Sequence, residues 1–389
     1  MMNVSFQTAD ADLGDADSAE LEQVRHTAFR FFAEEVEPYF AASEKRGHVD
    51  RELWRKAGSL GLLCPTISEE HGGLGGDFRH SRVIIEEMAK SGCELGGLYT
   101  HSDIVVPYIA RLGTANQRAK WLPGCISGDV WTCIGISEPD AGSDMRGLRT
   151  RAVREGAEWV LSGQKIFITN GWLADLAIIV ANTGDKAQGA KSLFLVETDR
   201  PGFRKGRLLE KVGQKAQDTA ELFLDEVRVP ADALLGEENR GLAHLMQELP
   251  RERLLIAISG LASAQTAFDL TVAYVRERRA FGKMIGDFQS TRFALAEMKA
   301  ELEVGKAFVS DCVAAVLSGT LGTTRASIAK LWVTEMQGRI VDRCVQLFGG
   351  YGYMWEYPIA RAFANARAQR IYGGSNEIMK EIIARDVYA

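Results

Sequence analysis

The spacing of apolar residues changes twice along the chain, and these two changes limit the folds that it can form. Residues 19–130 and 239–389 carry apolar side chains every three or four positions, which is the period of amphipathic helices. Between them, residues 131–238 break into short β-branched and aromatic runs separated by turn signals, which is typical of β-strands. We therefore predict an α+β multidomain protein with an N-terminal helical domain, a middle antiparallel β domain and a C-terminal four-helix bundle.

The length of 389 residues agrees with this division, because a single hydrophobic core rarely extends over so long a chain. Residues 1–18 carry several aspartates and no apolar run, so we predict a flexible acidic tail there. No arginine precedes Arg25, and neither a secretory signal nor a mitochondrial transit peptide has this composition. We therefore expect a cytoplasmic protein.

Charge and residue spacing exclude several classes of function. The net charge of −6 disfavours a nucleic-acid partner, and no apolar stretch approaches the roughly 18 residues that span a bilayer. The six cysteines form no Cys-x-x-Cys pair, which favours free thiols, and the six histidines show no metal-ligand spacing, so we predict no metal site. The glycine clusters open no strand–helix–strand unit, so they are poor candidates for a dinucleotide-binding fingerprint.

Three motifs indicate where chemistry takes place. The first, residues 135–144 (GISEPDAGSD), joins a short apolar strand to a turn of small and polar residues, where backbone N–H groups and a hydroxyl can approach a polar cofactor. The second is residues 346–353 (QLFGGYGY), and the third is residues 371–377 (IYGGSNE). Glycines in such runs allow close approach of the backbone to a ligand.

Together the three motifs resemble those of the acyl-CoA dehydrogenase family, flavoenzymes that desaturate acyl-CoA thioesters. The resemblance extends from about residue 21 to the end, with the family's order of domains. It implies FAD as cofactor, held at a site that two subunits build together, and hence a homo-oligomer, which we expect to be a tetramer made of two dimers. The cofactor-binding residues that it implies are Ile134, Ile136, Ser137, Gly142, Ser143, Phe167, Ile168, Thr169, Arg278, Phe281, Gln289, Gln346, Leu347, Phe348, Gly349, Gly350, Ser375, Asn376 and Glu377.

The sequence departs from the family pattern at the catalytic base. Many members have a glutamate directly before Gly374, whereas this chain has Gly373 there. The long-chain and isovaleryl subgroups place the glutamate on an earlier helix within Glu-Arg-Leu, and Glu252 occupies that position here. We therefore expect Glu252 to be the base, with a pKa raised by an apolar pocket. Pro250 is expected to bend this helix and to widen the pocket beside the base.

The resemblance also implies how the substrate is held. The backbone N–H at Gly373 and a hydroxyl of FAD are expected to bind the thioester oxygen, where negative charge develops. A helix that begins just after Gly374 would favour that charge. The substrate-binding residues that we predict are Ser143, Lys191, Ser192, Ala243, Pro250, Arg251, Arg253, Gly373 and Gly374.

We thus expect an FAD-dependent dehydrogenase that converts an acyl-CoA to a trans-2-enoyl-CoA and passes electrons to an electron-transfer flavoprotein. Two alternatives remain open. One is a flavin oxidase or monooxygenase on the same scaffold. The other is a non-catalytic member that binds acyl-CoA, which the missing glutamate at Gly373 makes plausible.

Overall fold

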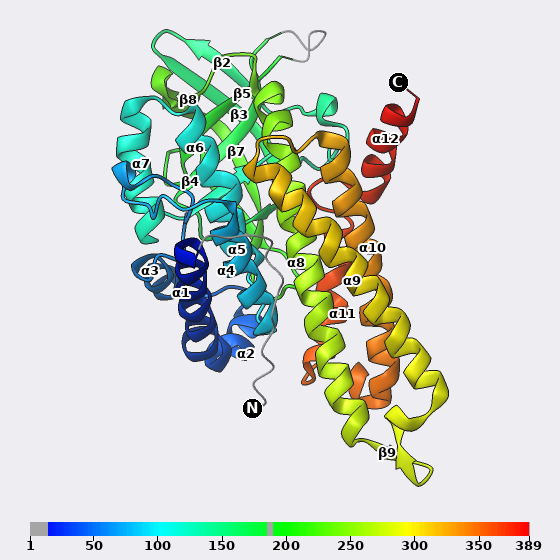
Figure 1. Ribbon diagram of the computed structural model, residues 1–389. Coiled ribbons are helices and arrows are strands. Elements are labelled where there is room, and N and C mark those ends of the chain that lie inside the picture. Colours follow the sequence, from blue (N-terminus) through cyan, green and yellow to red (C-terminus); the bar gives the residue numbers. More distant parts are fainter. Residues whose placement is uncertain (1–14, 185–189, 389) are drawn as a thin grey trace.

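The computed structural model describes residues 15–184 and 190–388, and it has the three predicted zones in the predicted order (Figure 1). The predicted α+β multidomain fold is confirmed. Helix α1 begins at Asp15, so the last four residues of the segment 1–18, predicted to be a flexible tail, are helical. Residues 1–14 of that segment lie outside the described residues.

The N-terminal zone consists of helices that are interrupted by two π-helical turns, η1 and η3. Two of its helices begin at capping boxes, one at Asp77 and one at Thr114, which satisfy N–H groups of the first helical turn. The elements are α1 (Asp15–Phe31), η1 (Phe32–Val36), α2 (Glu37–Arg46), α3 (Arg51–Ser59), η2 (Glu69–His71), α4 (Phe78–Lys90), α5 (Gly96–Tyr99), η3 (Thr100–Val105), α6 (Val106–Leu112) and α7 (Ala115–Ser127).

The middle zone forms one sheet, which has eight strands within the described residues, in the order β6-β7-β3-β2-β4-β5-β8 with β1 beside β4. The strands are β1 (Thr132–Gly135), β2 (Arg151–Glu155), β3 (Glu158–Thr169), β4 (Leu176–Asn182), β5 (Lys191–Glu197), β6 (Phe203–Leu208), β7 (Thr219–Pro230) and β8 (Leu234–Leu235). Most neighbours are antiparallel as predicted, but β1 and β2 each pair with β4 in parallel. These two parallel pairs are exceptions within the predicted antiparallel β domain, and the β2–β3 hairpin and the other intervening segments give the chain enough length to return in the same direction.

The C-terminal zone is a bundle around helix α8 (Gly241–Glu277), which is continuous through Pro250. Its other helices are α9 (Gln289–Leu317), α10 (Thr323–Phe348), α11 (Pro358–Gln369) and α12 (Asn376–Val387). A small hairpin of β9 (Arg279–Ala280) and β10 (Lys283–Met284) projects from the lower end of the bundle, far from the sheet (Figure 1). Helix α8 is long and apolar enough to cross a membrane by composition, but most of its apolar window is buried inside the protein, as expected of a core helix.

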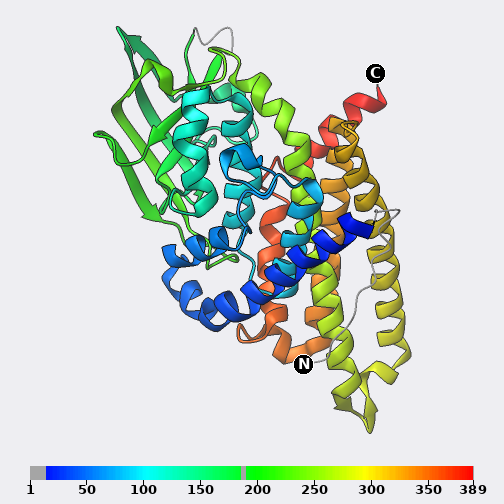
Figure 2. The same cartoon turned by 60° about the vertical axis from the view of Figure 1, so that its left-hand side comes forward.

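The two faces of the sheet pack against different cores. Along β4, Ile178 and Val180 join the large core shared with the helices, whereas Ala177 and Ile179 join a smaller core on the other face. In Figure 2 the strands lie at the upper left and the bundle at the right, with the N-terminal helices between and below them. At the end of β1, Ile134 and Ile136 pack against the larger core, which the sheet shares with the helices.

Candidate active site

Glu252 lies on α8 and is half-buried, with its carboxylate directed at a buried tyrosine of the N-terminal zone. The Tyr108 hydroxyl on α6 donates a hydrogen bond of 2.8 Å to Glu252 Oε1. Burial raises the pKa of Glu252 to about 7, while the bond from Tyr108 acts in the opposite direction. A carboxylate that changes protonation near neutral pH is suited to accept a proton from a weak carbon acid. The expectation of a raised pKa at this glutamate is confirmed.

The two arginines beside Glu252 are committed to other partners. Arg251 Nη1 donates to the Asp103 carbonyl at 2.9 Å. Arg253 is only 3% exposed, and its Nη1 donates to Ser327 Oγ at 3.2 Å. Arg251 and Arg253 were predicted to bind polar groups of the substrate. Both side chains are instead directed into the protein. The sequence gave no sign of these partners, because they lie on distant segments.

Gly373 and Gly374 form the turn before α12, and the space beside Gly373 is closed. Both have left-handed backbone angles, with φ of +66° and +89°, which favour glycine. A Cβ atom on Gly373 would lie 2.2 Å from Ile256 Cδ1. Ile256 lies one helical turn after Glu252, so the same face of α8 carries the carboxylate and the side chain that fills this space. A side chain at position 373 would thus meet a left-handed backbone angle and would require Ile256 to move.

The Gly373–Gly374 turn is held by a buried lysine that the sequence analysis missed. Lys330 on α10 is fully buried, and its Nζ donates 2.9 Å hydrogen bonds to the Gly374 carbonyl and to Asn376 Oδ1. Asn376 Nδ2 donates in turn to Glu335 Oε1 at 2.7 Å. The predicted cofactor contact of Asn376 is therefore not made by its side chain, which is directed into the bundle. Among its neighbours, Glu377 is exposed and Ser375 is half-buried.

The turn after β1 presents the first motif at an open surface. Ile134, Ile136 and Ser137 are partly exposed, and Gly142 and Ser143 are exposed, as expected of a ligand-binding edge. This arrangement brings together the predicted residues of the first motif.

A buried ion pair that the sequence analysis missed holds this turn. Lys165 Nζ donates to Glu138 Oε1 at 2.8 Å and to the Ile136 carbonyl at 3.1 Å. Glu138 also accepts hydrogen bonds from the backbone N–H groups of Arg149 and Thr150. The lysine and the glutamate look like ordinary surface residues in the sequence, so only the fold reveals their role.

Phe167, at the end of β3, combines an unusual backbone angle with an exposed side chain. It has a φ of +61°, which is strained for an aromatic residue, and its side chain is 68% exposed. An exposed ring held in a strained conformation is explained if it covers a planar partner such as an isoalloxazine ring. Thr169 Oγ1 accepts a hydrogen bond from Gln217, which leaves its own hydrogen free to donate. Ile168 was also predicted to bind the cofactor. Its side chain is instead buried in the smaller core and is not exposed to a ligand.

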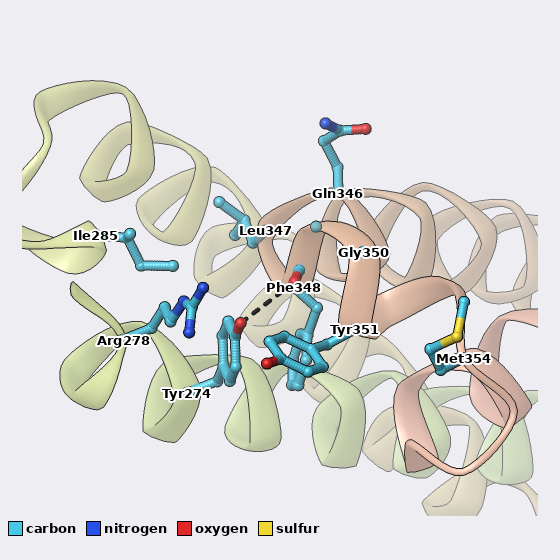
Figure 3. Close-up of a pocket in the computed structure, with 10 residues that line it drawn as sticks. Tyr274, Arg278, Ile285, Gln346, Leu347, Phe348, Gly350, Tyr351 and Met354 are labelled. Carbon is cyan, nitrogen blue, oxygen red and sulfur yellow. Dashed lines mark hydrogen bonds between the residues drawn. The ribbon is translucent and has the colours of Figure 1, made fainter. Parts of the chain in front are cut away.

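The remaining predicted cofactor residues gather at the opposite end of the bundle. A pocket of about 490 Å³ is lined by the C-terminal end of α8 and the segment after α10 (Figure 3). The Arg278 guanidinium lies 5.4 Å from the centre of the Tyr351 ring, and Tyr274 Oη donates to the Phe348 carbonyl at 3.3 Å. Gln346, Leu347, Phe348, Gly349 and Gly350 line the same pocket. Phe281 and Gln289 are exposed nearby and are not among its lining residues.

The two groups of predicted cofactor residues are too far apart for one molecule of cofactor within one chain. Glu252 and Arg278 are separated along α8, so at 1.5 Å per residue the distance is roughly 39 Å. This exceeds the length of a dinucleotide. The two groups of one chain therefore cannot contact the same dinucleotide molecule.

Two of the predicted substrate contacts are buried away from any open surface. Lys191 is 1% exposed and Ser192 is fully buried. The Ser192 hydroxyl shares a 2.7 Å hydrogen bond with Thr183 Oγ1 and accepts one from the Asn239 N–H. The prediction that these two side chains contact the substrate is therefore not supported by the fold. Ala243 and Pro250 are half-buried on the first turns of α8.

The cysteines and acidic side chains show no further centre of chemistry. All six cysteines lie in the described residues, where they are buried and free. Within residues 15–184 and 190–388, no group of three His, Cys, Asp or Glu side chains is placed to hold a metal ion.

Comparison with protein families identifies the three zones one by one. Residues 18–129 match the acyl-CoA dehydrogenase N-terminal domain, residues 133–227 the middle domain and residues 239–388 the C-terminal domain. A curated relative, the mitochondrial long-chain specific acyl-CoA dehydrogenase of Rattus norvegicus, is 51% identical over 95% of this chain and 87% of its own length.

Solved structures agree with the family comparison. An acyl-CoA dehydrogenase from Geobacillus kaustophilus superposes with a TM-score of 0.93 and 45% identity, over 97% of this chain and 99% of that one. A chain in a structure of the electron transferring flavoprotein of Acidaminococcus fermentans matches with a TM-score of 0.91 and 32% identity, over 97% and 99% of the two chains.

Proposed function

The chain belongs to the acyl-CoA dehydrogenase family, and from that premise we propose that it dehydrogenates a long-chain acyl-CoA with Glu252 as the catalytic base. Acyl-CoA dehydrogenation with FAD is the activity of the family. One observation carries the choice of base: Glu252 combines a pKa of about 7 with a position on the face of α8 that adjoins Gly373. The non-catalytic alternative loses its main support, because Glu252 supplies a carboxylate although position 373 has none.

The residues present fit FAD in two halves. The isoalloxazine end would be held by the turn after β1 together with Phe167 and Thr169, and the adenosine end by Arg278 and the 346–350 segment of a second chain. Arg278 suits a pyrophosphate because its guanidinium can form forked, charge-assisted hydrogen bonds. The chemistry that FAD supplies when bound is the acceptance of a hydride from the β-carbon of the substrate.

The protein's own part in the reaction is proton removal and charge stabilisation. Glu252 takes the α-proton, the α-carbon and β-carbon become doubly bonded as the hydride leaves, and the product is a trans-2-enoyl-CoA. Negative charge develops on the thioester oxygen during this step. The Gly373 N–H has no hydrogen-bond partner among the described residues, so it is free to donate to that oxygen. The start of α12 adds a favourable helix dipole.

The preference for long acyl chains rests on the rat relative, whose printed name gives that specificity. A panel of acyl-CoAs, from short branched to long straight, assayed with an artificial electron acceptor tests it. We expect the highest kcat/KM for long straight chains. A maximum at short or branched chains would overturn the proposed substrate class and leave the dehydrogenase activity intact.

We also propose that the working form is a homo-oligomer, a tetramer built from two dimers. The separation of the two half-sites supports at least a dimer, and Phe281, at 96% exposed, is an apolar ring available to a partner. Sedimentation of the FAD-loaded protein tests the proposal. A monomer that retains one tightly bound FAD per chain would contradict it.

We propose an electron-transfer flavoprotein as the electron acceptor, which the Acidaminococcus match supports. The alternative, an oxidase or monooxygenase that uses O₂, is separated by stopped-flow measurement. We expect acyl-CoA to bleach the flavin without air and reoxidation in air to be slow. Fast reoxidation would favour the oxidase. The cytoplasmic location stays a prediction.

A further inference from the structure

We infer that Tyr108 is the positioning residue of the base: its phenol holds one oxygen of the Glu252 carboxylate and leaves the other to accept the proton from the substrate. The inference rests on the proposed role of Glu252. Tyr108 belongs to no sequence motif of the site and contributes from a different domain. Its contact joins the N-terminal zone to the bundle at the reacting carboxylate.

The hydrogen bond is built into the packing. Tyr108 is 0% exposed, and a buried phenol normally needs a hydrogen-bond partner. It donates to Glu252 Oε1 at 2.8 Å, whereas Glu252 Oε2 has no partner among the described residues. The two oxygens therefore differ: Oε1 is fixed by the protein, and Oε2 is left to accept a proton.

The backbone before Tyr108 has an unusual form that serves the same contact. The π-helical turn η3 (Thr100–Val105) leads directly into α6, and such turns occur often at functional sites. The Asp103 carbonyl in this turn accepts the hydrogen bond from Arg251. Adjacent residues of α8, Arg251 and Glu252, are thus both tied to one short stretch of the N-terminal zone, which fixes the carboxylate relative to it.

The charged groups around Glu252 are occupied elsewhere. From its own helix, Glu248 pairs with Arg111 of α6 at 2.5 Å, and Arg251 lies 4.0 Å from the Asp103 carboxylate. Arg253 is bonded to Ser327 of α10, on the side where Lys330 holds the Gly374 carbonyl. Among these groups, Tyr108 alone is seen to donate directly to the Glu252 carboxylate.

The electrostatic effect of this bond has a definite sign. A hydrogen bond to the ionised form favours that form, so the Tyr108 bond lowers the pKa of Glu252 against the effect of burial. Burial raises the pKa of Tyr108 itself well above its usual value, so the phenol remains a neutral donor. Removal of the hydroxyl should therefore raise the pKa of Glu252 further.

The test is Tyr108→Phe in the FAD-loaded protein. We expect the acidic limb of kcat/KM to move up by about one pH unit, since a hydrogen bond to a charged group has this order of effect. Flavin reduction should fall roughly five- to tenfold at pH 7 and recover to within about twofold at pH 9, as expected of a base that is protonated more readily. FAD content should be unchanged. Tyr39→Phe, at an exposed tyrosine, is the control and should leave the profile where it is.

A second readout needs no turnover. The infrared carboxylic C=O band that is lost in Glu252→Gln reports the protonation of Glu252, and in Tyr108→Phe it should titrate at higher pH than in the parent. Site-specific 3-fluorotyrosine at position 108 keeps the packing and donates more strongly, so it should move the band to lower pH. This variant decides the question if Tyr108→Phe does not fold.

The outcomes separate the two proposals. An infrared titration of Glu252 that is unchanged by both substitutions overturns the positioning role, whatever happens to the rate. An equal loss of activity at every pH with a raised KM also overturns it, because Tyr108 would then contact the substrate or merely support packing. Full activity in Glu252→Gln would instead refute the assignment of Glu252 as the base. The infrared titration would then still report whether Tyr108 controls the protonation of Glu252.

Discussion

Ile256 occupies the space that a side chain at Gly373 would need: its Cδ1 atom is 2.2 Å from where a Cβ on Gly373 would lie. Ile256 and Glu252 lie one turn apart on α8. The helix that supplies the proposed base therefore also fills the space beside the other position used for a base in the family. The position of the base at Glu252 and the glycine at position 373 thus belong together. Moving the base to position 373 should fail unless Ile256 is also replaced.

The first prediction moves the base. Glu252→Gln should slow flavin reduction at least 10²-fold, since proton transfer by a positioned group contributes about 10²–10⁴. Adding Gly373→Glu should not restore activity and should destabilise the fold by roughly 1–3 kcal/mol, because the left-handed backbone at Gly373 strains a side chain and Ile256 must move. A third change, Ile256→Ala, should then recover part of the rate. Anaerobic stopped-flow reduction and thermal melting measure both effects, and recovery without Ile256→Ala would contradict the steric argument.

The second prediction concerns pH. Because Glu252 must be ionised to accept a proton and its pKa is about 7, kcat/KM should rise between pH 6 and pH 8. Glu248 adds to the raised pKa through like charge, so Glu248→Gln should move the rise to lower pH. Glu381→Gln on the exposed face of α12 serves as the control. A rise that stays in place or moves to higher pH in Glu248→Gln would contradict the like-charge effect.

The third prediction tests Lys330. In Lys330→Met the Gly374 carbonyl loses its buried donor, which should cost about 1–3 kcal/mol, whereas Asn376 Oδ1 keeps the bond from Thr334 Oγ1. The Gly373 N–H should also lose its fixed position, so flavin reduction should slow while FAD remains bound. Lys380→Met, at an exposed lysine of α12, is the matched control. Unchanged reduction rates in a folded Lys330→Met protein would remove Lys330 from the site.

The fourth prediction tests the distant half-site. Arg278→Ala should weaken FAD binding roughly 10- to 100-fold, as expected for the loss of a charge-assisted hydrogen bond to phosphate. Arg279→Ala, at the neighbouring exposed arginine, should have little effect. Equilibrium dialysis of FAD against the apoprotein measures both. Equal losses in the two variants would indicate general attraction by charge instead of a specific contact.

The fifth prediction uses the strain at Phe167. Glycine tolerates a φ of +61° without penalty, so Phe167→Gly should keep or raise the stability of the apoprotein by about 1 kcal/mol. The same change should weaken FAD binding, because the ring that covers the ligand is lost. Thermal melting without and with FAD separates the effects. A large loss of apoprotein stability would show that the ring serves packing instead.

The sequence by itself determined the order of the three zones, the family and the identity of the candidate base. These follow from local information: hydrophobic period decides helix or strand, and the glycine-rich motifs lie in contiguous runs. The resemblance to the family's motifs also assigned Arg278 and the 346–350 segment to one cofactor, and in the structure they line one pocket.

The tertiary structure decided what lies around each of these residues. Tyr108, Ile256 and Lys330 contact the site from segments far apart in the chain, and nothing in their own neighbourhoods distinguishes them from ordinary core residues. The burial of Lys191 and Ser192 and the inward direction of Asn376 were missed for the same reason. Solvation and hydrogen-bond partners depend on which surfaces meet, and that depends on how the domains pack together.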